Sequence, residues 1–107
     1  MNNEYALTES TFYILLSLLH PRHGYGIMQS TLEMSSGRVR LAPGTLYGAL
    51  STLCDKGWIV QLPIPDGSRK KVYGLTERGI QVLCCEIERL RELLRNADQM
   101  MEELNHE

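Results

Sequence analysis

The sequence predicts a mainly α-helical fold with a two-stranded β-wing and a long C-terminal helix. Three observations predict it: apolar residues at helical spacing before residue 56, an Asp66-Gly67 turn between two strand-like runs, and an apolar heptad from residue 80. A chain of 107 residues with 43% apolar content can bury one small core. We therefore expect a winged part over residues 1–75 and a long helix over residues 76–107.

The first two predicted helices are short and have clear ends. Thr8 is a suitable N-cap for a helix over residues 9–19, which is apolar on more than one side. Pro21 stops that helix, and a second helix is expected from Tyr25 to Met34, ahead of a connection that contains Gly37.

The third predicted helix begins at Pro43 and has two contrasting faces. One face repeats leucine at helical spacing, and the other is small, hydroxyl-bearing and almost uncharged: Thr45, Gly48, Ser51, Thr52 and Asp55. A solvated face usually carries Lys and Glu, whereas hydroxyls and a glycine suit close approach to DNA, where Ser and Thr reach base edges or phosphates. Gly48 costs about 1 kcal/mol of helix stability relative to Ala, and close approach to DNA is our hypothesis for that cost. The alternative is a short helix under a loop.

A basic hairpin follows this helix. Strand-like runs at residues 58–62 and 69–75 flank the Asp66-Gly67 turn. Residues 38–71 hold six bases against two acids, a balance of +4, whereas residues 76–107 hold four Arg against eight acids, a balance of −4. A local basic patch attracts nucleic acid even when net charge is negative. The alternative is a solvated strand edge.

The last helix, capped by Thr76, carries an unbroken apolar heptad. Its a and d positions, spaced alternately by three and four residues, are Ile80, Leu83, Ile87, Leu90, Leu94, Ala97, Met101 and Leu104. At 1.5 Å per residue the helix is about 40 Å long, more than a domain of this size covers. We expect it to meet a second chain, and the alternative is a helix folded back over its own domain.

The sequence contains no features typical of an enzyme, a metal site or a membrane protein. No nucleophile lies beside a base, no carboxylate pair sits in an apolar setting and no glycine loop suits phosphate, so we expect neither an enzyme nor a cofactor. Cys54, Cys84 and Cys85 lack zinc-ligand spacing, and a redox role for Cys84 and Cys85 stays open. No leader or membrane-spanning run is recognisable, so we expect a soluble cytoplasmic protein.

Three helices, a wing and a long helix make a winged helix-turn-helix, and the motifs resemble those of the PadR family of transcriptional regulators. They are HGYGI at 23–27, LAPGTLYGAL at 41–50, KGWI at 56–59 and SRKKVYGLTERG at 68–79. They cover nearly all of the chain in the family's order, and the single last helix resembles the short form of the family.

The resemblance implies that the helix from Pro43 enters the major groove while the wing lies over the adjacent backbone. Thr45, Tyr47 and residues 69–71 match family positions near DNA, and Tyr25 lies at the start of the supporting helix. Together with the basic and small polar residues above, the candidate contacts to double-stranded DNA are Tyr25, Arg38, Arg40, Gly44, Thr45, Tyr47, Gly48, Ser51, Ser68, Arg69, Lys70 and Lys71.

The resemblance also implies a repressor that releases DNA when a small hydrophobic or aromatic effector binds. In multidrug-sensing relatives a tryptophan of the long helix stacks on the ligand, whereas here the only tryptophan is Trp58 and residues 80–104 contain no aromatic residue. Other side chains could line an effector pocket in place of a tryptophan, and the alternative is that they form ordinary dimer core. They are Tyr5, Phe12, Tyr13, Met100 and Met101.

Two functions remain in view. The first is a homodimeric repressor that reads an inverted repeat with half-sites about 34 Å apart or a multiple of that distance. The second is a protein-interaction adaptor that dimerises without binding DNA.

Overall fold

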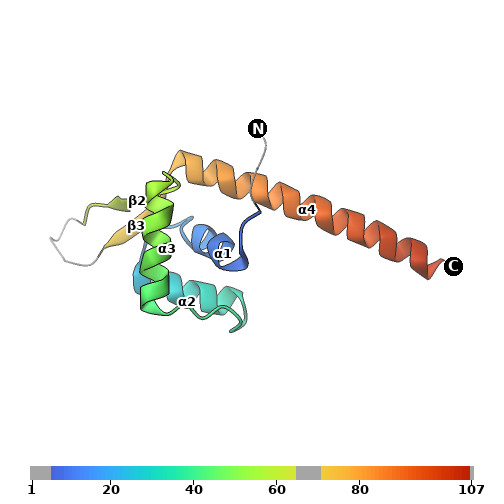
Figure 1. The fold of residues 1–107 in the computed structure, drawn as a ribbon, viewed down its shortest axis with the longest axis horizontal. Coiled ribbons are helices and arrows are strands. Elements are labelled where there is room, and N and C mark those ends of the chain that lie inside the picture. Colours follow the sequence, from blue (N-terminus) through green and yellow to red (C-terminus); the bar gives the residue numbers. More distant parts are fainter. Residues whose placement is uncertain (1–5, 65–70, 107) are drawn as a thin grey trace.

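Four helices and three short strands make up the described part of the chain, residues 6–64 and 71–106, in the computed structural model (Figure 1). They are α1 (Glu9–Ser17), β1 (Arg22–His23), α2 (Gly24–Met34), α3 (Pro43–Asp55), β2 (Ile59–Leu62), β3 (Val72–Leu75) and α4 (Glu77–Asn105). The predicted mainly α-helical fold with a β-wing and a long last helix is confirmed.

Local hydrogen bonds explain where α1 begins and ends. The Thr8 side chain accepts the backbone N–H of Thr11 at 3.1 Å, as expected of an N-cap. The helix ends at Ser17, two residues earlier than predicted, because Leu18 and Leu19 donate to carbonyls only three residues back. This tighter turn leads the chain into β1.

The core lies where the three short helices meet the sheet and the first turns of α4. Leucine and isoleucine side chains fill it, and Trp58 and Tyr73 contribute the aromatic rings. Its buried members are Ile14, Leu15, Leu18, Ile27, Leu46, Leu50, Leu53, Trp58, Ile59, Tyr73 and Leu83. All three leucines of the predicted apolar face of α3 are therefore buried.

The wing is part of a three-stranded antiparallel sheet with the order β1-β3-β2. Strands β2 and β3 pair from Ile59 with Leu75 to Leu62 with Val72, which confirms the predicted hairpin. Strand β1 was not predicted, because two residues are too few to show an alternating pattern. It brings the start of α2 beside the wing. The turn at residues 66–67 lies outside the described residues.

The start of α4 is fixed against the end of α3. Thr76 caps α4 by accepting the N–H of Gly79 at 3.0 Å and donates its hydroxyl to the carbonyl of Gly57 at 2.6 Å. A Cβ on Gly79 would overlap the carbonyl oxygen of Trp58. Glycine therefore occupies the position where a capping box would have Glu, because the backbone of Trp58 packs there.

A buried carboxylate joins α4 to the segment before α1. Glu86 is 1% exposed, accepts the N–H of Leu7 at 3.0 Å and forms a bidentate ion pair with Arg89 at 2.6 and 2.8 Å. Burial of a carboxylate requires such partners. The hydrogen bond with Leu7 helps to fix the direction in which α4 leaves the domain, while Arg89, on the same helix, compensates the charge of Glu86.

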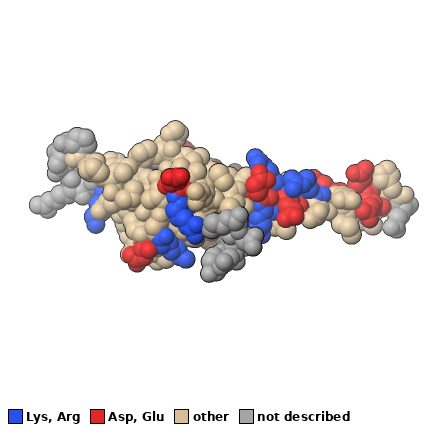
Figure 2. All heavy atoms as spheres, turned by 90° about the horizontal axis from the view of Figure 1, so that it is seen from above, with Lys and Arg blue, Asp and Glu red and all other residues tan. Residues whose placement is uncertain are grey.

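Beyond this anchor α4 projects into solvent and does not fold back over the domain (Figure 1). The described molecule measures 64 × 32 × 20 Å, and the projecting helix accounts for its elongated shape. In Figure 2, arginine and acidic side chains lie side by side along the part of this helix nearer the domain, while the domain shows wide uncharged areas. No helix in the described residues is long and apolar enough to cross a membrane.

Candidate nucleic-acid interface

Helix α3 presents an exposed polar face opposite its three buried leucines. Thr45, Gly48, Ser51 and Thr52 are all exposed on it. The Thr52 hydroxyl donates to the carbonyl of Gly48 at 3.2 Å, one turn back along the same helix. This face carries no charge before Asp55, as the sequence predicted, and it faces away from the core.

Two glycines of α3 face open space in the described part of the chain. A Cβ built on Gly44 or Gly48 would have no neighbouring atom within 4 Å. Packing inside the described domain therefore does not require glycine at either position. A requirement for glycine would have to come from a surface that approaches from outside.

Tyr47 covers the first turn of α2. A Cβ on Gly24 would lie 2.5 Å from the Tyr47 hydroxyl, so glycine at residue 24 makes room for the ring. Tyr47 is 47% exposed and does not belong to the core cluster. The tyrosine therefore links α3 to α2 while part of its ring remains accessible.

A cavity of about 530 Å³ opens where β1, the start of α2, α3 and the wing meet. It is lined by Arg22, His23, Gly24, Tyr25, Gly26, Tyr47 and Lys71. The fold thus brings together Tyr25, Tyr47 and Lys71, three candidates that lie far apart in the sequence. No acidic residue is among the described residues that line it.

Arg22 is the basic lining residue that the sequence analysis did not include among the candidate contacts. It precedes the basic stretch 38–71, and only the pairing of β1 with β3, with Arg22 opposite Tyr73, brings it to the wing. Its Nε donates to the carbonyl of Ser17 at 2.6 Å, which orients the guanidinium group. Spacing alone could not reveal the strand, because its two residues carry no periodic pattern.

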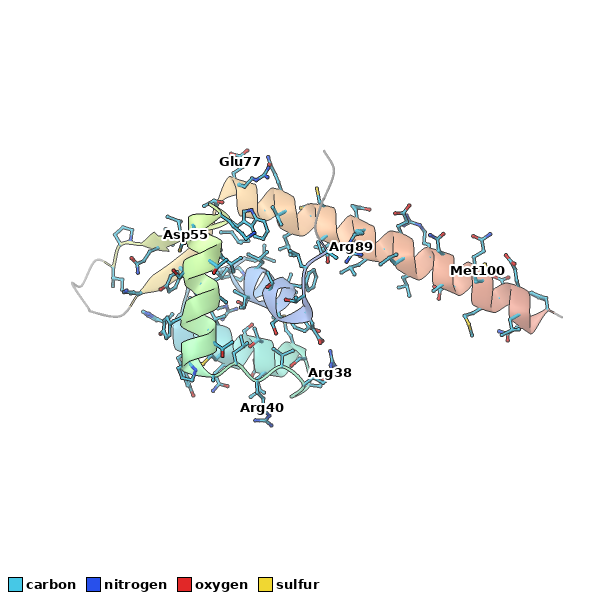
Figure 3. All side chains as sticks on the ribbon, in the orientation of Figure 1. Arg38, Arg40, Asp55, Glu77, Arg89 and Met100 are labelled. Carbon is cyan, nitrogen blue, oxygen red and sulfur yellow. The ribbon has the colours of Figure 1, made fainter. Side chains whose placement is uncertain are left out.

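The bases of residues 38–71 do not form one cluster. Arg38 forms an ion pair with Glu9 of α1, and the hydrogen bond and charge of Glu9, with a contribution from Tyr13, raise the pKa of the Arg38 guanidinium. Arg40 points away from the domain below α2 (Figure 3). The Lys56 ammonium lies 4.9 Å from the centre of the Trp58 ring. Lys71 alone of these four lines the cavity.

The tip of the wing lies outside the described residues. Ser68, Arg69 and Lys70, three of the predicted DNA contacts, fall there. Their neighbour Lys71 is exposed and immediately precedes β3.

The predicted heptad divides into two parts with different surroundings. Leu83 is buried and Ile87 half-buried against the core of the same chain, whereas Ile80 is exposed. The exposed remainder is apolar over a wide stripe, to which the structure adds Leu93 and Met100: Leu90, Leu93, Leu94, Ala97, Met100, Met101 and Leu104. Figure 3 shows Met100 on the projecting part of α4, far from the winged domain.

The cysteines and metal-ligand residues show no site. Burial, with a smaller contribution from Asp55, raises the pKa of the Cys54 thiol, which disfavours its thiolate. Cys84 is exposed and Cys85 half-buried on α4. Within the described residues, no group of three His, Cys, Asp or Glu side chains could hold a metal ion.

A helical pair with an exposed polar second helix, a flanking wing and a long projecting helix defines a winged helix-turn-helix protein. The chain belongs to the PadR-like family of transcriptional regulators, whose family model matches residues 12–84, more than half of the sequence. The resemblance inferred from the motifs is thereby confirmed. No curated protein matches the chain.

Solved structures agree with this family. A transcriptional regulator from Thermoplasma acidophilum is 27% identical, with 87% of this chain and 90% of that chain covered and a TM-score of 0.65. A PadR family transcription regulator from Clostridium difficile is 22% identical, with 88% and 99% covered and a TM-score of 0.72. A DNA-binding protein from Sulfolobus solfataricus is 20% identical, with 90% and 92% covered and a TM-score of 0.63. The last two establish the fold alone.

Proposed function

We propose that the protein is a homodimeric, sequence-specific DNA-binding repressor that reads an inverted repeat in the cytoplasm. In this function α3 enters the major groove with Thr45 and Ser51 toward base edges. Lys71, Tyr25 and Tyr47, together with the wing tip, hold the flanking phosphate backbone.

The observation that carries the proposal is the exposed, uncharged face of α3 beside a cavity whose lining includes two basic residues and two tyrosines. Phosphate contacts position a protein on the duplex, and contacts in the groove read its sequence. The two kinds of surface lie side by side in this chain, as both tasks require. Arg38 pairs with Glu9, but both side chains are exposed, so Arg38 stays a candidate contact together with Arg40 and the glycines of α3.

The apolar stripe of α4 supports the homodimer. A soluble monomer rarely exposes a contiguous row of large apolar side chains, and Leu94, Met100 and Met101 are each more than half exposed. A second copy of α4 covers such a stripe by heptad packing. The dimer then doubles the DNA-binding surface.

Release by a small hydrophobic or aromatic effector completes the proposal. Because α4 carries no aromatic residue, such a molecule would bind against its aliphatic and methionine side chains and would not stack on a tryptophan.

The experiment is a binding titration on duplex fragments that the protein selects from genomic DNA. Replacing Arg69, Lys70 and Lys71 with Ala should weaken binding to all sequences alike. It should also reduce the slope of log K against log salt by about 0.9 for each phosphate that the variant no longer neutralises. Thr45→Ala should instead change the sequence preference, because it alters the surface that faces the groove.

Arg95→Ala is the matched control, since it removes an exposed cation from α4, away from α3 and the wing. It should leave both the affinity and the salt slope unchanged. A triple variant that binds as tightly as the wild type would remove the wing from the proposal, and a wild type that retains no duplex at low salt would contradict DNA binding altogether.

A further inference from the structure

One exposed tyrosine at the edge of the cavity has its hydroxyl held by a neighbouring side chain. The Gln29 Nε2 donates to the Tyr25 hydroxyl oxygen at 2.7 Å, from one turn further along α2. Tyr25 is 67% exposed and Gln29 is exposed as well. The pair is therefore not part of the core, so packing inside the domain does not account for this hydrogen bond.

This hydrogen bond determines where the tyrosine hydrogen is available. An amide NH₂ group can only donate, so the phenol oxygen acts as the acceptor and the O–H hydrogen must point elsewhere. No described residue is seen to accept that hydrogen. Gln29 thus leaves Tyr25 as an oriented hydrogen-bond donor facing solvent.

The surroundings of this donor favour an anion. Arg22 and Lys71 line the same cavity, and no described lining residue is acidic. The N-cap residue of α2, His23, makes no side-chain capping hydrogen bond, so the first N–H groups of the helix add positive potential. A hydroxyl donor in such a setting suits a phosphate oxygen better than a neutral base edge.

We propose that Gln29 is a positioning residue for DNA binding, which holds the Tyr25 hydroxyl so that its hydrogen is donated to a backbone phosphate. The inference rests on the proposed function and adds to it a residue that makes no contact with DNA itself. Gln29 orients the donor before DNA arrives, so that less rotational freedom is lost on binding.

A double-mutant cycle tests this role on the full-length protein and a duplex selected from genomic DNA. Gln29→Met keeps the length and helix propensity of the side chain but removes the donor, and Tyr25→Phe removes the hydroxyl. We expect binding to weaken about threefold for Gln29→Met and about tenfold for Tyr25→Phe. The double variant should bind no more weakly than Tyr25→Phe alone, since Gln29 acts only through the hydroxyl.

Two further measurements separate positioning from other roles. The salt slope should stay at its wild-type value in all three variants, because no cation is removed. Gln29→Glu should weaken binding more than Gln29→Met, since the carboxylate accepts the tyrosine hydrogen and repels the phosphate. Equal melting temperatures would exclude a folding effect.

The outcomes separate this inference from the function on which it rests. Additive losses in the double variant, or wild-type binding by Gln29→Met or by Tyr25→Phe, would overturn the role of Gln29 and leave DNA binding intact. Failure of the wild type to bind any duplex would overturn both.

Discussion

Gly48 and Gly79 are both helical glycines, but their surroundings differ. A Cβ on Gly79 would overlap the Trp58 carbonyl oxygen and lie 2.9 Å from its carbonyl carbon, so glycine there is a requirement of the fold. A Cβ on Gly48 would meet nothing within 4 Å. The cost of Gly48 to helix stability is thus not offset within the described domain.

This difference predicts opposite effects of the same substitution. Gly48→Ala should raise the free energy of unfolding by about 1 kcal/mol, the difference in helix propensity, while it weakens DNA binding by crowding the duplex. Gly79→Ala should lower the free energy of unfolding by about 2 kcal/mol or more because of overpacking. Urea denaturation measures the stabilities, and titration with the selected duplex measures the affinity of Gly48→Ala. A stabilised Gly48→Ala variant with unchanged affinity and sequence preference would refute close approach at this residue.

At the scale of single elements, the sequence predicted helices better than it predicted their surroundings. The Thr8 and Thr76 caps, the leucine face of α3 and the β2–β3 hairpin are each local patterns, and all are present. Strand β1 is stabilised by pairing with β3, which lies far along the chain. Its two residues carry no periodicity, so no local pattern could predict it.

The apolar heptad predicted for α4 is present, but its first part packs against the domain of the same chain and only the rest is exposed. Leu83 packs inside its own domain, because the helix starts against Trp58 and the sheet. Only the part from Leu90 onward remains for a partner, and Leu93 and Met100 widen its stripe to a third heptad position. A stripe of that width suits more than a narrow two-helix seam.

Helix α4 should therefore determine the oligomeric state without affecting the winged domain. Replacing Leu94 and Met101 with Ser should dissociate the proposed dimer, because both side chains are exposed in the single chain and lie one heptad apart. Replacing Glu92 and Gln99 with Ser alters the opposite side of the same helix at the same spacing and is the matched control. Sedimentation gives the mass, and circular dichroism checks the fold. A dimer that persists in the Leu94 and Met101 double variant would place the interface elsewhere.

At the scale of the whole molecule, the candidate site was predicted in parts but not as an assembly. The exposed polar face of α3 follows from its own composition, whereas the cavity depends on three segments that are far apart in the sequence, which contribute Arg22 with Tyr25, Tyr47, and Lys71. Arg38 shows the converse: its charge counted toward a basic patch in the sequence, yet Glu9 pairs with it in the structure. Charge counts include every base, but they cannot say which ones an acid neutralises.

The rigid attachment of α4 has a consequence for the spacing of the DNA half-sites. The Glu86 carboxylate accepts the N–H of Leu7 and so ties α4 to the segment before α1, and Thr76 ties the start of α4 to Gly57. In the proposed dimer, two winged domains joined through α4 would be held at a fixed distance, which should match half-sites about 34 Å apart or a multiple of that distance. Adding five base pairs between the half-sites turns one of them to the far side of the duplex. Adding ten restores the side but separates the half-sites by about one further turn of roughly 34 Å.

We expect both insertions to reduce the affinity to that of a single half-site, because the anchored helices cannot lengthen to follow the second one. Anisotropy titrations with the native, five-pair and ten-pair duplexes measure this directly. A duplex with one half-site replaced by unrelated sequence provides the reference for binding through one domain. Equal affinity for all three spacings would mean that the two domains bind independently, and it would contradict a dimer whose geometry is fixed by the buried anchor of α4.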